Sequence, residues 1–290
     1  MGNSVAFVIS AAIIVVTTIP MPKPVQRTGS IWNEVSYGIV AYFKTPRLRS
    51  LLILYFAVAC ASAMIIVNTI IYVKEYLGGS DFELAIFFAA SGIGSMLAAL
   101  SFPKLSSVFN DKLIVQSGAI FLAVGLGMMA TEPMFSFALF CWFITGVGWS
   151  LVQTPSGKIV NMSADPADRS SYFSAQFALS HLCWLITYPI TGQLVLYFGF
   201  GFTAAFLACI VLTCFIFSIL FWPTEDEDIL NHQHKTLVHS HAHGHDDQHH
   251  IHQHGNDLDQ ESHNHEHQHH EVVHTHKFVI DLHHQEWPKG

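Results

Sequence analysis

The chain has 290 residues, of which 51 % are hydrophobic and only 12 % are charged, and its formal net charge is −8. This composition indicates an integral membrane protein rather than a soluble one. Residues 1–223 have ten basic and eight acidic side chains, whereas residues 224–290 have three basic and thirteen acidic ones and nineteen of the twenty histidines. A boundary near Pro223 therefore separates a hydrophobic body from a soluble, histidine-rich tail.

Apolar runs suited to transmembrane helices recur along the body of the chain. The expected spans are residues 4–19, 51–73, 84–103, 113–131, 134–154, 170–195 and 202–222. The first run has only 16 residues and ends at Pro20, whereas a bilayer requires ~20. We therefore expect a partial helix at 1–19, a cytoplasmic linker at 20–50, a six-helix bundle at 51–222 and a disordered tail at 223–290, in an N-terminally truncated chain.

The connections between the spans alternate in charge. Those at 20–50, 104–112 and 155–169 contain nine Lys and Arg, whereas those at 74–83, 132–133 and 196–201 contain only Lys74. Cytoplasmic loops collect basic residues, so we expect the three basic connections on the cytoplasmic side of the cell membrane. This orientation puts the N-terminus outside and the tail in the cytoplasm.

The span after Arg169 has its polar residues on one side of the predicted helix. At about 100° per residue, a stripe and its flank contain the candidate transport-cavity residues Gln176, Ser180, His181, Cys183, Trp184, Thr187 and Tyr188. Because unpaired polar groups are costly in hydrocarbon, the stripe faces other helices or a wet cavity. Interhelical hydrogen bonding and cavity lining both remain open here. If metal passes this helix, His181 is the best single ligand, assisted by Cys183 and Gln176.

Two local signals accompany this helix and the second span. The segment Asp165–Asp168 predicts a helix start, with an acidic cap and proline in the first turn. Asn68, deep in the second span, shares a helical face with Cys60 and Met64. Its amide needs a partner there, and we weigh structural bonding and cavity lining equally for it.

Several motifs carry a resemblance to a known family. They are Gly146-Val147-Gly148-Trp149, Gln153-Thr154-Pro155-Ser156-Gly157-Lys158, Ala167-Asp168-Arg169 and Gln176-Phe177-Ala178-Leu179-Ser180-His181. With the short first span, a basic loop and six further spans, they resemble the nickel-resistance exporters of the major facilitator superfamily, which also end in His-rich tails. The loop Pro103–Lys112 keeps only a trace of the superfamily's glycine–aspartate–arginine signature.

This resemblance implies the fold and the partners. It implies an all-α integral membrane protein with seven transmembrane helices: the last helix of the first half and the six-helix second half of a major facilitator fold. Substrates of such transporters lie between the two halves. The expected partners are therefore divalent metal ions, the lipid bilayer, and a missing N-terminal half or a second protomer. We expect no nucleic-acid partner.

The tail is the most distinctive segment for ligand chemistry. Its candidate metal ligands are His239, His241, His243, His245, His249, His250, His252, His254, His263, His265, His267, His269, His270, His274 and His276. Imidazole binds borderline divalent ions, and the tail contains no Cys or Met for Cu(I). We therefore expect Ni, Co or Zn ions at the tail, and no tightly bound cofactor. A solvating tail without a specific role is the simplest alternative.

Three functions fit these features. The first is a secondary transporter that exports a divalent transition metal, nickel first and cobalt second, from the cytoplasm. The second is an exporter of a small organic molecule such as a drug or siderophore, which leaves the tail unexplained. The third is a membrane-anchored metal buffer that does not transport. An enzyme is not expected, because the chain shows no phosphate loop and no nucleophile–base pairing.

Overall fold

The structure is a computed structural model. It describes residues 2–17, 31–166, 168–223, 229–234, 237–243, 263–269, 272–280 and 287. The helices are α1 Gly2–Val16, α2 Ile31–Lys44, α3 Pro46–Ile71, α4 Asp81–Val108, α5 Asp111–Met129, α6 Phe135–Met162, α7 Arg169–Phe198 and α8 Phe200–Phe221. A π-helical turn, η1 Tyr72–Tyr76, continues α3.

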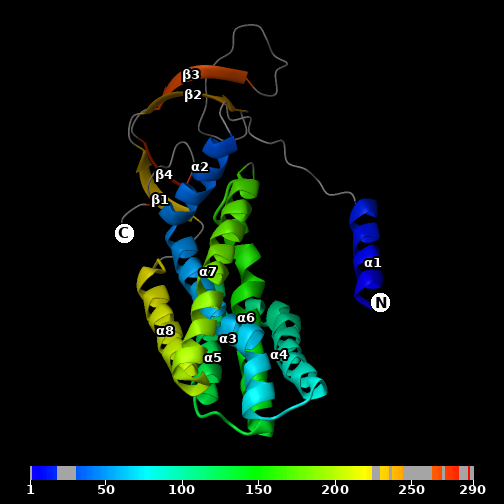
Figure 1. Ribbon diagram of the computed structural model, residues 1–290. Coiled ribbons are helices and arrows are strands. Elements are labelled where there is room, and N and C mark those ends of the chain that lie inside the picture. The colour runs from blue at the N-terminus through cyan, green and yellow to red at the C-terminus, as the bar shows by residue number, and fades with distance from the viewer. Residues whose placement is uncertain are drawn as a thin grey trace.

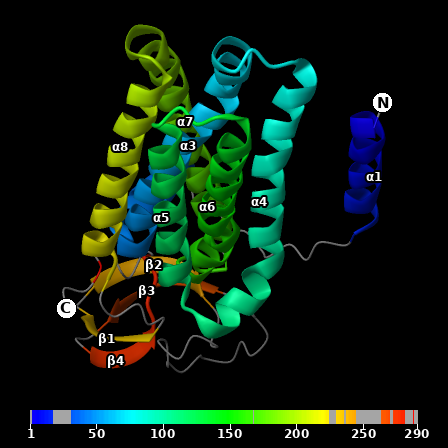
Figure 2. The same cartoon turned by 90° about the horizontal axis from the view of Figure 1, so that it is seen from below.

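Six helices, α3 to α8, are long and apolar enough to cross a membrane. They match the last six expected spans and confirm a multi-pass, helical membrane protein. The first expected span forms α1, which has 15 residues and is shorter than the ~20 that a bilayer requires. It lies apart from the bundle in both views (Figures 1 and 2).

Within the bundle, α6 lies against α4 and α5, while α3 lies against α7 and α8. Small residues permit the closest of these approaches. A Cβ at Gly94 of α4 would overlap the Phe143 carbonyl of α6, and one at Gly146 of α6 would overlap the Ser91 carbonyl of α4. Gly94 and Gly146 therefore allow α4 and α6 to pack closely.

An aromatic cluster closes one end of the bundle, where α3 ends and α4, α6 and α8 begin. Its members are Tyr72, Phe87, Trp142 and Phe200, all fully buried. The ring centroids of Tyr72 and Phe200 are 4.3 Å apart, and those of Phe87 and Trp142 are 4.9 Å apart in an edge-to-face arrangement. Trp142 also donates its indole N–H to Thr69 Oγ1 at 2.8 Å. We call this end the far end.

The opposite, tail-side end is where α3 and α7 begin, α8 ends and the strands gather (Figure 1). Here α2, which forms within the expected linker at 20–50, lies against α7. The contact is close because Gly38 meets the backbone of Ser171, where a Cβ would overlap the Ser171 carbonyl. Only Thr45 separates α2 from α3, so the basic connection is helical over much of its length.

Four segments of the tail form strands: β1 Ile229–His234, β2 Leu237–His243, β3 His263–His269 and β4 Val272–Lys277. They pair antiparallel as β1 with β4 and β2 with β3, which differs from the disordered tail expected from the sequence. Alternating His-x-His runs have the period of a strand, and pairing satisfies their backbone hydrogen-bonding groups. Composition alone did not reveal this pairing, since the partners are distant in sequence.

Candidate functional site

The helix that carries the predicted polar stripe, α7, places its polar residues in two different surroundings. A buried row faces the rest of the bundle: Gln176, Ser180, Cys183, Thr187 and Thr191. An open row is exposed or half-buried on the neighbouring side: His181, Trp184 and Tyr188. The predicted stripe and its flank therefore differ in what they can contact.

Two residues of the buried row, Gln176 and Thr187, form hydrogen bonds with neighbouring helices. Gln176 Oε1 accepts a hydrogen bond from the hydroxyl of Tyr42 on α2. The Thr187 hydroxyl donates to the Ala59 carbonyl of α3 at 3.3 Å. Burial raises the pKa of Tyr42 well above its usual value, with Tyr55 and Cys183 adding to the effect. The Tyr42 hydroxyl therefore stays protonated and acts as the donor. These are interhelical bonds of the kind that hold membrane bundles together.

Cys183 belongs to a group of buried thiols. Cys60 of α3 and Cys214 of α8 are, like Cys183, buried and not in disulfides. Even so, in the part of the chain that the structure describes, no three His, Cys, Asp or Glu side chains are arranged to hold a metal ion. Any ligand set that includes Cys183 or His181 would need a group from outside these described residues.

The open row lines a shallow groove of about 600 Å³ on the outer surface of α7. The His181 ring packs on Phe177, with ring centroids 3.8 Å apart, and meets Trp184 edge-on at 4.8 Å. Its Nδ1 lies 2.7 Å from the Phe177 carbonyl. A carbonyl only accepts, so Nδ1 carries the proton, and in the neutral ring Nε2 keeps its lone pair. Tyr188 donates weakly to Ser62 of α3 at 3.5 Å.

Asn68 lies apart from both rows and is fully buried in α3. Its Nδ2 donates to the Ala63 carbonyl at 3.4 Å and contacts the Met64 sulfur at 3.7 Å, both within its own helix. Its Oδ1 has no hydrogen-bond partner among the described residues. The hydrogen bonds of the Asn68 side chain in this structure are therefore within its own helix.

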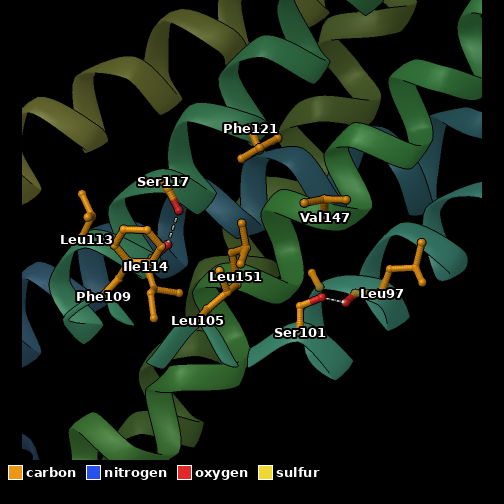
Figure 3. Close-up of a pocket in the computed structure, with 11 residues that line it drawn as sticks. Leu97, Ser101, Leu105, Phe109, Leu113, Ile114, Ser117, Phe121, Val147 and Leu151 are labelled. Atoms are coloured by element: carbon orange, nitrogen blue, oxygen red, sulfur yellow. Dashed lines mark hydrogen bonds between the residues drawn. The ribbon is translucent and has the colours of Figure 1, made fainter. Parts of the chain in front are cut away.

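A second groove, of about 560 Å³, lies between α4, α5 and α6 (Figure 3). Its lining is apolar except for the hydroxyls of Ser101 and Ser117. Each hydroxyl donates at 2.7 Å to a carbonyl of its own helix, that of Leu97 or Ile114. The groove includes none of the predicted site residues and presents no unpaired polar group to a ligand.

The tail histidines are described only in part. Among the predicted ligands, His239, His241, His243, His263, His265, His267, His269, His274 and His276 occupy strand positions. The remainder lie outside the described residues: His245, His249, His250, His252, His254 and His270. In β2 and β3 the register sets three histidine pairs opposite each other: His239 with His267, His241 with His265, and His243 with His263.

Sequence reasoning missed the tyrosines at the tail-side end and the residues that they contact. The Tyr37 hydroxyl of α2 donates to Asp168 Oδ2 at 2.9 Å. The helix α7 begins at Arg169 without a side-chain cap, so the predicted start, with Asp165 as the cap and Pro166 as the first helical residue, is three residues too early. Tyr172 donates to the Ile280 carbonyl at 2.9 Å. The apolar triplet Phe278–Ile280 within a polar tail was the signal available in the sequence.

Comparison with known protein families identifies the bundle. The Major Facilitator Superfamily matches residues 51–252, which is more than half of the chain. A search of curated proteins finds no match. The matched region begins within α3, includes the other five membrane-capable helices of the described residues and extends into the tail. The chain belongs to the major facilitator superfamily and is a multi-pass membrane protein of the secondary transporter class.

Proposed function

We propose that this chain serves a secondary transporter that exports a divalent transition-metal ion, nickel first and cobalt second, from the cytoplasm. The observation that carries the proposal is the register of β2 and β3, with its three opposed histidine pairs. Directly opposed residues in an antiparallel pair have Cβ atoms about 4.5–5.5 Å apart. Two imidazoles at that spacing are within reach of one ion, since metal–nitrogen bonds are about 2 Å long.

The chemistry of the tail supports a borderline ion. Residues 224–290 contain nineteen histidines and thirteen carboxylates but no Cys or Met. Imidazole suits Ni, Co and Zn, whereas Cu(I) prefers sulfur ligands. The ions are cargo in this proposal, and no tightly bound cofactor is required.

The direction of transport follows from the proposed orientation. Nine Lys and Arg lie in the connections on the tail side, and only Lys74 lies in those on the far side. By the positive-inside rule, the tail is cytoplasmic in the cell membrane. A tail that collects metal there delivers it to an outward route.

The open row of α7 is the proposed wall of that route. His181 donates Nδ1–H to the Phe177 carbonyl. A hydrogen bond of this kind orients metal-ligating histidines and leaves Nε2 for the ion. The groove is open on its outer side, so the route needs a second wall. That wall is an N-terminal half or a second protomer.

The decisive test is metal export by cells that produce the protein. Cells with the protein should accumulate less nickel than cells without it. A variant with the six opposed histidines of β2 and β3 changed to Asn should bind fewer ions in calorimetry on the full chain and export less. Normal nickel binding with unchanged accumulation in every strain would contradict export and identify a membrane-anchored metal buffer instead.

A second function, export of a small organic molecule, is favoured by the groove itself. Its lining combines Trp184 and Tyr188 with leucines and Pro189, and aromatic grooves with few polar groups suit amphipathic ligands. An organic substrate should be exported whether or not the tail histidines are present, whereas metal export should depend on them. Comparing the two substrates in the histidine variant separates the functions.

A further inference from the structure

The last described part of the tail returns to the bundle and is buried there. Phe278, Val279 and Ile280 are 2 %, 6 % and 4 % exposed, and Phe278 and Ile280 join the main apolar core. The Trp287 ring meets Phe278 edge-on, with centroids 5.0 Å apart. The Arg47 guanidinium lies 5.6 Å from the Trp287 centroid, within the range of a cation–π contact. We call residues 278–280 and 287 the anchor.

The anchor joins helices that are far apart in the sequence. The Ile280 carbonyl accepts from Tyr172 of α7 at 2.9 Å and from Tyr37 of α2 at 3.2 Å. A carbonyl oxygen has two lone pairs, so one acceptor can bridge both helices. The single Tyr37 proton also faces Asp168 Oδ2, at the shorter distance of 2.9 Å. Tyr172 is therefore the stronger of the two donors to the anchor.

The anchor makes the histidine-rich segment a loop that is fixed at both ends. At its start, Trp222 is 3 % exposed at the end of α8. At its end, β4 runs directly into Phe278. In the register of β1 and β4, His232 lies opposite His274, four residues before Phe278. The position of this histidine pair is therefore tied through β4 to that of the anchor.

From this geometry we propose that the anchor is a docking element for the tail-side end of the bundle, and that metal bound across β1 and β4 strengthens its docking. The metal-dependent part rests on the proposed function. The docked structure sets His232 and His274 opposite each other, so an ion held by both binds the docked state better than the undocked one. A ligand shifts an equilibrium by its differential affinity for the two states. Metal binding in the tail therefore stabilises the contacts that the anchor makes with α2 and α7.

Hydrogen exchange of the full chain in nanodiscs tests docking without metal. Tyr172→Phe removes the stronger donor and keeps the ring, so amide exchange across residues 272–287 should become about fivefold faster. Tyr37→Phe should have a smaller effect, because its proton is shared with Asp168. The matched control is Tyr197→Phe on the same helix, whose side chain is 78 % exposed. The docking role of the anchor would be overturned if amide exchange across residues 272–287 were equally fast in Tyr172→Phe, Tyr37→Phe and the control.

The same measurement with saturating nickel tests the coupling. In the wild type, nickel should slow exchange across 272–287 by about tenfold. The variant His232→Asn/His274→Asn should lose this response, whereas His241→Asn/His265→Asn, in the other strand pair, should keep it and bind fewer ions. Nickel bound in calorimetry with unchanged exchange would overturn the coupling and leave the proposed function standing. No nickel bound by the full chain would overturn both, while the tyrosine variants would still report on docking.

Discussion

The two ends of the bundle are closed by different kinds of contact. At the far end, aromatic side chains from the membrane-spanning helices and η1 pack on one another, with Trp142 and Tyr72 at the centre. At the tail-side end, α2 and the anchor complete the closure, and neither belongs to a span. The far end is therefore built into the bundle, whereas the tail-side closure can detach without breaking a transmembrane helix.

The largest contrast expected between the ends is in their exposure to the two sides of the membrane. Ser80, at the far end, and Ser107, at the tail-side end, are both exposed. In a Cys209→Ala background, Ser80→Cys should react with an impermeant thiol reagent on intact cells, and Ser107→Cys only after the cells are opened. The opposite pattern would reverse the orientation and with it the proposed direction of transport.

A matched pair of substitutions compares the two closures in stability. Phe87 at the far end is fully buried and Phe278 in the anchor is 2 % exposed. Phe87→Ala should lower the free energy of unfolding by about 3–5 kcal/mol. Phe278→Ala should change it by about 0.5 kcal/mol or less, because we expect the anchor to open locally before the bundle unfolds.

Denaturant unfolding in detergent, followed by tryptophan fluorescence, measures both changes. Hydrogen exchange across 272–287 should nevertheless rise in Phe278→Ala, since its local packing is lost. An equally large loss of global stability in both variants would mean that the anchor is part of the cooperative core.

Nickel and pH should act on one end only. Metal binds neutral imidazole, so protons compete with it as the pH falls through about 6.5. Nickel affinity of the full chain should be high at pH 7 and should fall below pH 6 by about tenfold per pH unit for each histidine in a ligand set. Calorimetry at pH 7, 6 and 5 measures this, and affinity that does not change over this range would rule out histidine ligands. At constant pH, nickel should leave hydrogen exchange at the far end unchanged.

The smallest structural effect is expected for His181, which is exposed on α7. His181→Gln should change stability by about 0.5 kcal/mol or less. If the route runs along the open row, the variant should reach the membrane in normal amounts and lose nickel resistance. Leu185→Ala, an exposed neighbour in the same groove, is the control. Full resistance in His181→Gln would remove this histidine from the route.

The positions of the membrane-capable helices could be predicted from the sequence, but the contacts between helices could not. Apolar runs located all six membrane-capable helices because burial in lipid requires about 20 apolar residues for each. Periodicity also placed Gln176 and Thr187 on one face of α7. It did not show that Tyr42 and Ala59 lie opposite them, because such contacts depend on how the helices pack.

The tail was harder to predict for a related reason. Its composition indicated disorder, since few apolar residues are available for a core. The pairing of His241 with His265 and the burial of Ile280 against Tyr172 join positions that are distant in the chain. A single sequence shows neither contact, although the apolar triplet Phe278–Ile280 marked the segment that binds the bundle.

Fixing the tail at both Trp222 and Phe278 also has a consequence for local concentration. A tethered binding group explores a volume set by its linker, and its effective concentration for nearby sites reaches the millimolar range. Seventeen imidazoles lie between the two fixed points. If the tail binds metal as proposed, an ion released by one imidazole should meet another before it diffuses away. The proposed function would therefore place a high local concentration of metal ligands beside the tail-side end of the bundle.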